Sequence, residues 1–146
     1  MKVIDLAVRH VECISAPTSI RDCALAMRRR HVGSLVVTDS DNKPIGVITD
    51  RDITIEVTAM GRDPLATSVA DVMTSPVVTA KSDDDLVDAL AKMREFGIRR
   101  LPVVDESGLL VGVITNSNML EELAVMLDSL VRDIKSSKTR EIELRP

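Results

Sequence analysis

The stretch Gly46-Val47-Ile48-Thr49-Asp50-Arg51-Asp52 is the most informative part of the sequence. It continues an apolar run of the kind that forms a short buried strand, and a hydroxyl and two carboxylates then follow within four residues. A strand that ends here and leads into a helix would gather Thr49, Asp52 and free backbone N–H groups around one concave spot. Such places commonly bind small polar ligands, phosphates above all. The stretch therefore predicts a ligand cleft at a strand end.

The same pattern occurs a second time later in the chain. Gly112-Val113-Ile114-Thr115-Asn116-Ser117-Asn118 has Asn118 in the place of Asp52, which gives an offset of 118 − 52 = 66 residues. This offset aligns residues 3–53 with residues 69–119 without a gap, and 13 of the 51 aligned pairs are identical. Repeats of this kind indicate two copies of one supersecondary unit.

Each copy is expected to form a helical turn, a strand, a helix, a two-stranded hairpin and a final helix that leaves the polar motif. Good N-cap residues precede the middle helix of each copy, whose apolar residues recur at the i, i+4, i+7 spacing of one buried face. The expected elements are Val3–Ala7, Val11–Ser15, a helix capped by Thr18, Ser34–Thr38 and Ile45–Thr49 in the first copy, and Val69–Met73, Val77–Lys81, a helix capped by Asp84, Arg100–Val104 and Val111–Thr115 in the second.

The fold class expected from these elements is α+β (α/β-like). A three-stranded sheet with helices on one side needs cover on its other side, and the sister copy is the simplest cover. We therefore expect two β-α-β-β-α repeats packed with pseudo-twofold symmetry around one shared core, plus a C-terminal helix. The expected boundaries are 1–60 for the first repeat, 61–68 for a linker, 69–120 for the second repeat and 121–146 for a helix extension with a charged tail.

The C-terminal helix carries an apolar seam. Its leucines and one isoleucine fall at heptad a and d positions, namely Leu120, Leu123, Leu127, Leu130 and Ile134. Two heptads are too short for a stable free coiled coil, so we expect this helix to pack on its own body or on a second subunit. A homodimer is the expected assembly. The final Ser136–Pro146 is charged and expected to fray.

Composition argues against several classes of partner. The net charge is −4 and Phe96 is the only aromatic residue, so the chain offers neither a basic field nor stacking platforms for nucleic acid. No apolar run approaches the roughly 20 residues that span a bilayer, and the first residues do not have the pattern of a signal peptide. We therefore expect no nucleic-acid partner, no membrane partner and a cytoplasmic location.

The sequence offers little support for catalysis or for a metal site. Cys13 and Cys23 are too few for a disulfide framework and are expected to be reduced structural thiols. His10 and His31 belong to no metal-ligand or nucleophile–base pattern. The acidic run at 83–85 is explained by a helix cap and a solvated first turn. We expect no catalytic residue, no metal and no enzymatic activity.

The repeated unit resembles the CBS domain, which is named after cystathionine beta-synthase. The signature of that family is a strand followed by Gly-apolar-apolar-Ser/Thr-x-x-Asp, and residues 46–52 match it fully. The second copy matches up to Asn118. A further hallmark, Leu-Pro-Val-Val-Asp, is present at residues 101–105, with a looser version at 35–39. The resemblance covers nearly all of 3–120, and the chain looks like a stand-alone tandem pair of CBS domains.

The resemblance implies a regulatory role and a set of ligand-binding residues. CBS pairs hold adenosine-containing ligands such as AMP, ADP, ATP or S-adenosylmethionine in their clefts, and many dimerise into a disk. In family members the residue that matches Asp52 receives both ribose hydroxyls, which suits the two acceptor oxygens of a carboxylate. Thr49 would contact the sugar or phosphate. The other residues carried over are Arg99 and Arg100 for phosphate, and Cys13, Ile14, Ser15, Gly33, Ser34 and Leu35 for adenine.

The second cleft, at Thr115 and Asn118, is expected to be weaker. Asn118 has no charge, and the facing residues Gly33 and Ser34 bring none. This cleft would be empty or would hold a less anionic ligand.

Two hypotheses about function follow from these features. The first is a sensor module that binds an adenine nucleotide or a related adenosyl ligand and acts on an unknown regulated protein. The second is a ligand-free interaction scaffold with vestigial clefts. In the first case the nucleotide is a regulatory ligand, and no other cofactor is expected.

Overall fold

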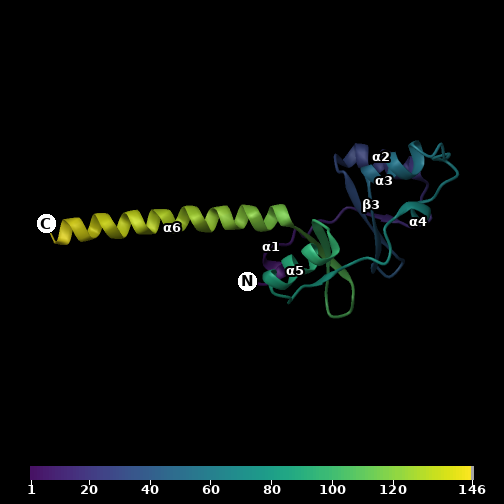
Figure 1. Cartoon of the computed structure of the whole chain (residues 1–146). Helices are drawn as coiled ribbons and strands as arrows, with labels where there is room; N and C mark the ends of the chain where they lie inside the picture. Colours follow the sequence, from purple (N-terminus) through teal and green to yellow (C-terminus); the bar gives the residue numbers. More distant parts are fainter. Residues whose placement is uncertain (146) are drawn as a thin grey trace.

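The computed structural model of the protein describes residues 1–145. The two copies of the repeat lie next to one another, and a long helix extends away from them (Figure 1). In chain order the elements are α1 (Val3–Leu6), β1 (Cys13–Ser15), α2 (Ile20–Arg30), β2 (Ser34–Thr38), β3 (Pro44–Thr49), α3 (Asp50–Asp52), the π-helical segment η1 (Ile53–Thr58), α4 (Val69–Val72), β4 (Ala80–Lys81), α5 (Leu86–Phe96), β5 (Arg100–Val104), β6 (Leu110–Thr115) and α6 (Asn116–Leu144).

Each copy forms one three-stranded sheet. The strand orders are β1-β2-β3 and β4-β5-β6, with the first pair parallel and the second antiparallel in both sheets. The parallel pair needs a crossover connection, which α2 and α5 provide. The register also repeats, because Ser34 lies opposite Thr49 and Arg100 lies opposite Thr115. The predicted α+β class with two equivalent repeats is confirmed.

The N-caps of the two middle helices lie one residue later than the sequence predicted. Ser19 caps α2, and its hydroxyl accepts a hydrogen bond from the backbone N–H of Asp22 at 3.1 Å. Asp85 caps α5, and its Oδ1 accepts a hydrogen bond from the backbone N–H of Val87 at 3.4 Å. The predicted cap Thr18 instead shares a hydrogen bond between its hydroxyl and that of Ser15, at 2.8 Å. Neighbouring hydroxyl and carboxylate residues are all good caps, so the sequence alone could not choose between them.

The short opening helices are exchanged between the two copies. Val3 of α1 is fully buried among residues of the second sheet such as Leu101, and its backbone N–H donates to the carbonyl of Asp84 at 2.8 Å. Val69 of α4 is buried in the same way among residues of the first sheet, including Ile48. The sequence predicted both helical turns but not this exchange.

The buried side chains consequently form two clusters, where one shared core was expected. One cluster surrounds the β1-β2-β3 sheet and contains Val69 and Val72 from α4. The other surrounds the β4-β5-β6 sheet and contains Val3 from α1. Each sheet face is closed by its own helix together with the exchanged turn, so the cores stay separate while neither is made from one copy alone.

The segments that follow α1 and α4 run beside the last strand of the opposite copy. Val8 and Val113 exchange two backbone hydrogen bonds, of 2.9 and 3.0 Å. Thr74 and Val47 exchange two more, of 2.9 and 3.2 Å. These four bonds join the copies through backbone groups, which accounts for donors and acceptors that would otherwise be left unpaired.

The glycine of each signature motif makes room for this crossing segment. A Cβ atom on Gly46 would lie 2.7 Å from the sulfur of Met73 and 2.9 Å from the carbonyl oxygen of Thr74. A Cβ atom on Gly112 would lie 3.0 Å from the carbonyl oxygen of Val8. The need for glycine at these two positions therefore comes from the close approach of backbones between the copies.

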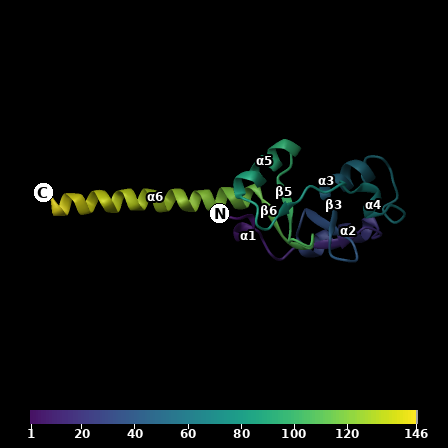
Figure 2. The same ribbon diagram turned by 90° about the horizontal axis from the view of Figure 1, so that it is seen from below.

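Helix α6 begins beside α1 and α5 and then projects from the body (Figures 1 and 2). The helix continues through Ser136 to Leu144, where the sequence predicted a frayed tail. Its polar face is supported by an i,i+4 pair in which Arg132 Nε donates to Asp128 Oδ2 at 2.9 Å. Among the helices within residues 1–145, α6 included, none combines the length and the apolar character needed to cross a bilayer.

Candidate functional site: two clefts between the repeats

Two clefts lie between the copies and are related by the 66-residue offset. The one that contains Asp52, with a volume of about 260 Å³, is called the Asp52 cleft. The one that contains Asn118, with a volume of about 320 Å³, is called the Asn118 cleft. Val47, Arg100 and Pro102 line both of them. The repeat therefore produces two similar cavities whose walls are partly shared.

The Asp52 cleft combines a polar strand end with basic and apolar groups of the second copy. Thr49 and Asp52 stand at the end of β3 and the start of α3. The cleft is lined by Val47, Thr49, Asp52, Thr74, Pro76, Val77, Val78, Gly97, Ile98, Arg99, Arg100 and Pro102. The predicted ribose and phosphate residues are thus brought together in one cavity.

Asp52 has a structural task and a free oxygen at the same time. Its backbone N–H donates to Thr49 Oγ1 at 3.1 Å, and the backbone N–H of Thr49 donates to Asp52 Oδ2 at 2.9 Å, which makes a capping box. No hydrogen bond within residues 1–145 engages Asp52 Oδ1. A carboxylate has two acceptor oxygens, so capping the helix and accepting a ligand hydroxyl are compatible.

Asn118 makes the same cap but presents the opposite chemistry to its cleft. The backbone N–H of Thr115 donates to Asn118 Oδ1 at 3.0 Å, and the N–H of Asn118 donates to Thr115 Oγ1 at 3.1 Å. The cap therefore uses the amide oxygen of Asn118. The remaining Nδ2 group is a hydrogen-bond donor, whereas Asp52 Oδ1 is an acceptor.

The residues predicted for adenine do not gather with Asp52. Gly33, Ser34 and Leu35 line the Asn118 cleft, and Cys13, Ile14 and Ser15 line neither cleft. The physical reason is that the segments after α1 and α4 cross between the copies. The signature motif at the end of β3 therefore faces the start of β5, and the motif at the end of β6 faces the start of β2.

Sequence reasoning missed the apolar wall of the Asp52 cleft. Val77 and Val78 come from the segment before β4, and Ile98 comes from the turn before β5. Their counterparts at the 66-residue offset, Val11, Glu12 and Val32, line the Asn118 cleft. The repeat alignment was the signal that could have placed them, once the exchange between copies was known.

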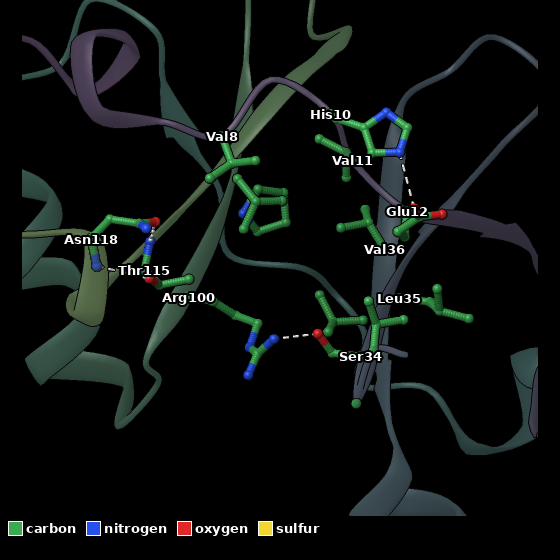
Figure 3. Close-up of a pocket in the computed structure, with 15 residues that line it drawn as sticks. Val8, His10, Val11, Glu12, Ser34, Leu35, Val36, Arg100, Thr115 and Asn118 are labelled. Carbon is green, nitrogen blue, oxygen red and sulfur yellow. Dashed lines mark hydrogen bonds and ion pairs between the residues drawn. The ribbon is translucent and has the colours of Figure 1, made fainter. Parts of the chain in front are cut away.

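The Asn118 cleft contains basic residues that the sequence did not predict there. Arg100 extends across the cleft, and its guanidinium donates to the hydroxyl of Ser34 on the opposite copy (Figure 3). His10 also lines the cleft, with its Nε2 atom 3.0 Å from Glu12 Oε1. Glu12 is paired a second time, to Arg30 at 3.2 Å.

The two cysteines have the properties of inert thiols. Burial raises the pKa of Cys23 to about 11, and burial is also the main cause that raises the pKa of Cys13, with Glu12 adding to it. Both thiols are therefore protonated near neutral pH, and the thiolate is the reactive form. Within residues 1–145 no three His, Cys, Asp or Glu side chains are grouped so that they could hold a metal ion.

Taken together, the duplicated α+β unit and the two clefts define a module of two tandem repeats with pseudo-twofold symmetry. The sequence matches the CBS domain over residues 3–58 and again over 69–125. The chain therefore belongs to the CBS domain family.

Two known proteins resemble the chain over most of its length. The CBS domain-containing protein YhcV of Bacillus subtilis is 36% identical over 123 residues, which cover 84% of this chain and 83% of that protein. The crystal structure of Hypoxic Response Protein I with two coordinated zinc ions has a TM-score of 0.75 at 26% identity, covering 83% of this chain and 98% of that one.

A second similar structure contains adenosine compounds. It is the CBS domain pair of protein MJ0100 in complex with 5′-methylthioadenosine and S-adenosyl-L-methionine. Its TM-score is 0.76 at 24% identity, and the match covers 86% of this chain and 98% of that one. At this level of identity the likeness establishes the fold.

Proposed function

We propose that this protein is a regulatory module that binds an adenosine-containing ligand in the Asp52 cleft and transmits its presence to a partner protein. The observation that carries the proposal is the composition of that cleft. One carboxylate with a free oxygen, two arginines and an apolar wall line a single cavity. The complex of the MJ0100 pair with two adenosine compounds supports the same ligand class.

Each part of an adenine nucleotide has a matching group in the Asp52 cleft. Asp52 Oδ1 can accept from a ribose hydroxyl, and hydrogen bonds to a charged group are worth about 1.5–3 kcal/mol. Arg99 and Arg100 can donate to phosphate oxygens, for which guanidinium geometry is well suited. Val77 and Val78 provide an apolar surface for the base.

The two arginines favour a phosphorylated ligand. The compounds bound to the MJ0100 pair, 5′-methylthioadenosine and S-adenosyl-L-methionine, have no phosphate. In the present chain such compounds would leave Arg99 and Arg100 without an anionic partner, so AMP, ADP or ATP should bind more tightly than either of them.

Thermal unfolding with a panel of compounds tests the proposal. The panel consists of AMP, ADP, ATP, NAD, S-adenosylmethionine and 5′-methylthioadenosine, with GMP as a control for the base. A true ligand at 100 times its dissociation constant stabilises the folded state by about 2.7 kcal/mol, which gives a clear rise in melting temperature. No shift with any compound at millimolar concentration would contradict the proposal.

The alternative is a ligand-free interaction scaffold, and the projecting helix α6 favours an interaction role in either case. Its apolar seam is more than half exposed at Leu120, Leu123 and Leu127. An exposed apolar stripe of this size is typical of a protein contact. We place a second copy of the chain on this seam, which makes the proposed assembly a homodimer, and we propose no enzymatic activity for it.

A further inference from the structure

Arg100 is shared by the two clefts. It is the first residue of β5 in the second copy, where it lies opposite Thr115 of the Asn118 cleft. Its guanidinium donates to Ser34 of the first copy, and its side chain lines both cavities. Figure 3 shows the side chain reaching from the strand of one copy toward Ser34 on the strand of the other.

The two clefts depend on this side chain to different degrees. The Asp52 cleft has a second arginine, Arg99, which does not line the Asn118 cleft. Apart from Arg100, the only cationic candidate among the described residues of the Asn118 cleft is His10, and Glu12 already pairs with it. Arg100 is therefore the main source of positive charge for the Asn118 cleft.

The polar groups beside Arg100 in the Asn118 cleft are suited to an anion. The Nδ2 group of Asn118 is a donor because the helix cap uses the amide oxygen. The hydroxyl of Ser34 accepts from Arg100 and so can direct its own hydrogen toward a ligand. With Arg100 in its present position, this cleft offers a guanidinium, an amide and a hydroxyl as donors to an anionic oxygen.

We propose that Arg100 couples the two clefts, so that an anionic ligand in the Asp52 cleft weakens the binding of a second anionic ligand in the Asn118 cleft. The inference rests on the proposed function, because it takes a phosphorylated ligand in the Asp52 cleft as its starting point. A phosphate there competes with Ser34 for the same guanidinium. When Arg100 turns to that phosphate, the Asn118 cleft loses its principal cation.

Linkage makes the effect reciprocal. A ligand that holds Arg100 in the Asn118 cleft must weaken phosphate binding in the Asp52 cleft by the same factor. Couplings between two sites are typically 5- to 150-fold in affinity. The chain would therefore bind one phosphorylated ligand strongly and a second one only at much higher concentration, which widens the range of concentrations over which it responds.

Nuclear magnetic resonance with ADP as the probe can follow each cleft separately. The backbone amide of Thr49 reports on the Asp52 cleft and that of Thr115 on the Asn118 cleft. Asp52→Asn weakens the first cleft while keeping the helix cap, as Asn118 does in its own copy. The expected result is that ADP binds at the Thr115 reporter at least fivefold more tightly in Asp52→Asn than in the unmodified chain.

Two arginine variants provide the matched comparison. In an Arg100→Ala background, Asp52→Asn should no longer change the affinity at the Thr115 reporter. In an Arg51→Ala background the fivefold effect should persist, because Arg51 is exposed and lines neither cleft. The dispersion of the amide spectrum of each variant confirms that it is folded.

Three outcomes would overturn the coupling and leave ADP binding in the Asp52 cleft intact. These are an unchanged affinity at Thr115 in Asp52→Asn, an effect that survives Arg100→Ala, and no ADP binding in the Asn118 cleft of any variant. Absence of ADP binding from both clefts of the unmodified chain would overturn the coupling and would contradict ADP as the ligand class. The failures of the two proposals are thus distinguishable.

Discussion

At the scale of single residues, Asp52 and Asn118 differ in the one side-chain atom that the helix cap leaves free in each cleft. Both side chains close the same capping box with the same geometry. Asp52 then has an oxygen left for its cleft, whereas Asn118 has an NH₂ group. The substitution between the two copies therefore leaves the fold unchanged and reverses the hydrogen-bonding character of the cleft.

This pair allows a clean test of the ribose contact. Asp52→Asn should weaken the binding of the adenine nucleotide by about 1.5–3 kcal/mol, roughly ten- to a hundredfold, because a charged acceptor is replaced by a neutral donor. Titration calorimetry measures the affinity, and Asp50→Asn serves as the matched control because it removes the same charge from a residue that lines neither cleft. Equal affinity in Asp52→Asn and the unmodified chain would exclude Asp52 as a ribose ligand.

The Cys23 thiol gives a prediction about pH. Its pKa is raised to about 11 in the folded chain from an ordinary value of 9.0, because burial disfavours the thiolate. Below pH 9 the folded and unfolded chains both keep the proton, and the contribution to stability is complete. From pH 9 to pH 11 only the unfolded chain loses it, so the free energy of unfolding should fall by up to about 3 kcal/mol.

Urea unfolding between pH 8 and pH 11 measures this decline. Cys23→Ala should remove most of it, although the variant is less stable at every pH because it leaves a small cavity. Cys13→Ala should retain most of it, since Cys23 is the thiol with the large shift. The three proteins differ only at the substituted cysteine, so contributions from all other groups cancel in the comparison. An identical pH dependence in Cys23→Ala would contradict the assignment.

At the scale of elements, the sequence predicted the strands well where the pattern was local. Ser34–Thr38 and Arg100–Val104 have the predicted bounds, and each hairpin partner is longer by one residue, at Pro44 or Leu110. The first strand of each copy is shorter than predicted, because only Cys13–Ser15 and Ala80–Lys81 pair with a neighbour. The apolar residues of a four-residue helix such as α1 indicate that the helix is buried, but they do not indicate which sheet it packs against.

A local pattern does not show which distant segments pack together, and this limit also decided which site residues could be predicted. Thr49 and Asp52 follow from the local motif, and the family resemblance added Arg99 and Arg100, all of which line the Asp52 cleft. The apolar wall comes from segments that are distant in the sequence and depends on how the copies cross. Gly33–Leu35 was assigned to this cleft without that knowledge, and it lines the other one.

The close approach of the segment after α4 to strand β3 can be tested at Gly46. Gly46→Ala should destabilise the fold by about 1–3 kcal/mol, because the added methyl overlaps the carbonyl oxygen of Thr74 at 2.9 Å and the backbone must move. Urea unfolding measures the loss. Gly33→Ala is the control, since the nearest atom there is the mobile carboxylate end of Asp50 at 3.1 Å. Equal stability of Gly46→Ala and the unmodified chain would contradict the packing described.

At the scale of the whole molecule, α6 is the element whose apolar face is left exposed in a single chain. Its seam residues Leu120, Leu123, Leu127, Leu130 and Ile134 are between 52% and 67% exposed. Their a and d spacing matches the surface by which helices pair, and a second copy offers the same seam. The body beneath the helix covers only its first turns (Figure 2).

Light scattering tests the homodimer. At micromolar concentration the mass should be about twice the 15.9 kDa of one chain. Leu127→Glu should return the protein to a single-chain mass, because it places a charge in the middle of the seam. Ser129→Glu, on the opposite face of the helix, should leave the mass unchanged. A single-chain mass for the unmodified protein would refute the homodimer.

The exchange of α1 and α4 also governs the order in which a growing chain can fold during translation. The first core needs Val69 and Val72, so it stays open until the ribosome has made the start of the second copy. Val3 precedes the whole second copy in the chain, yet the cluster that it shares with Ile114 exists only after β6 has emerged. The side chain of Val3 therefore stays unburied while residues 4–115 are synthesised, a period in which chaperones have access to it.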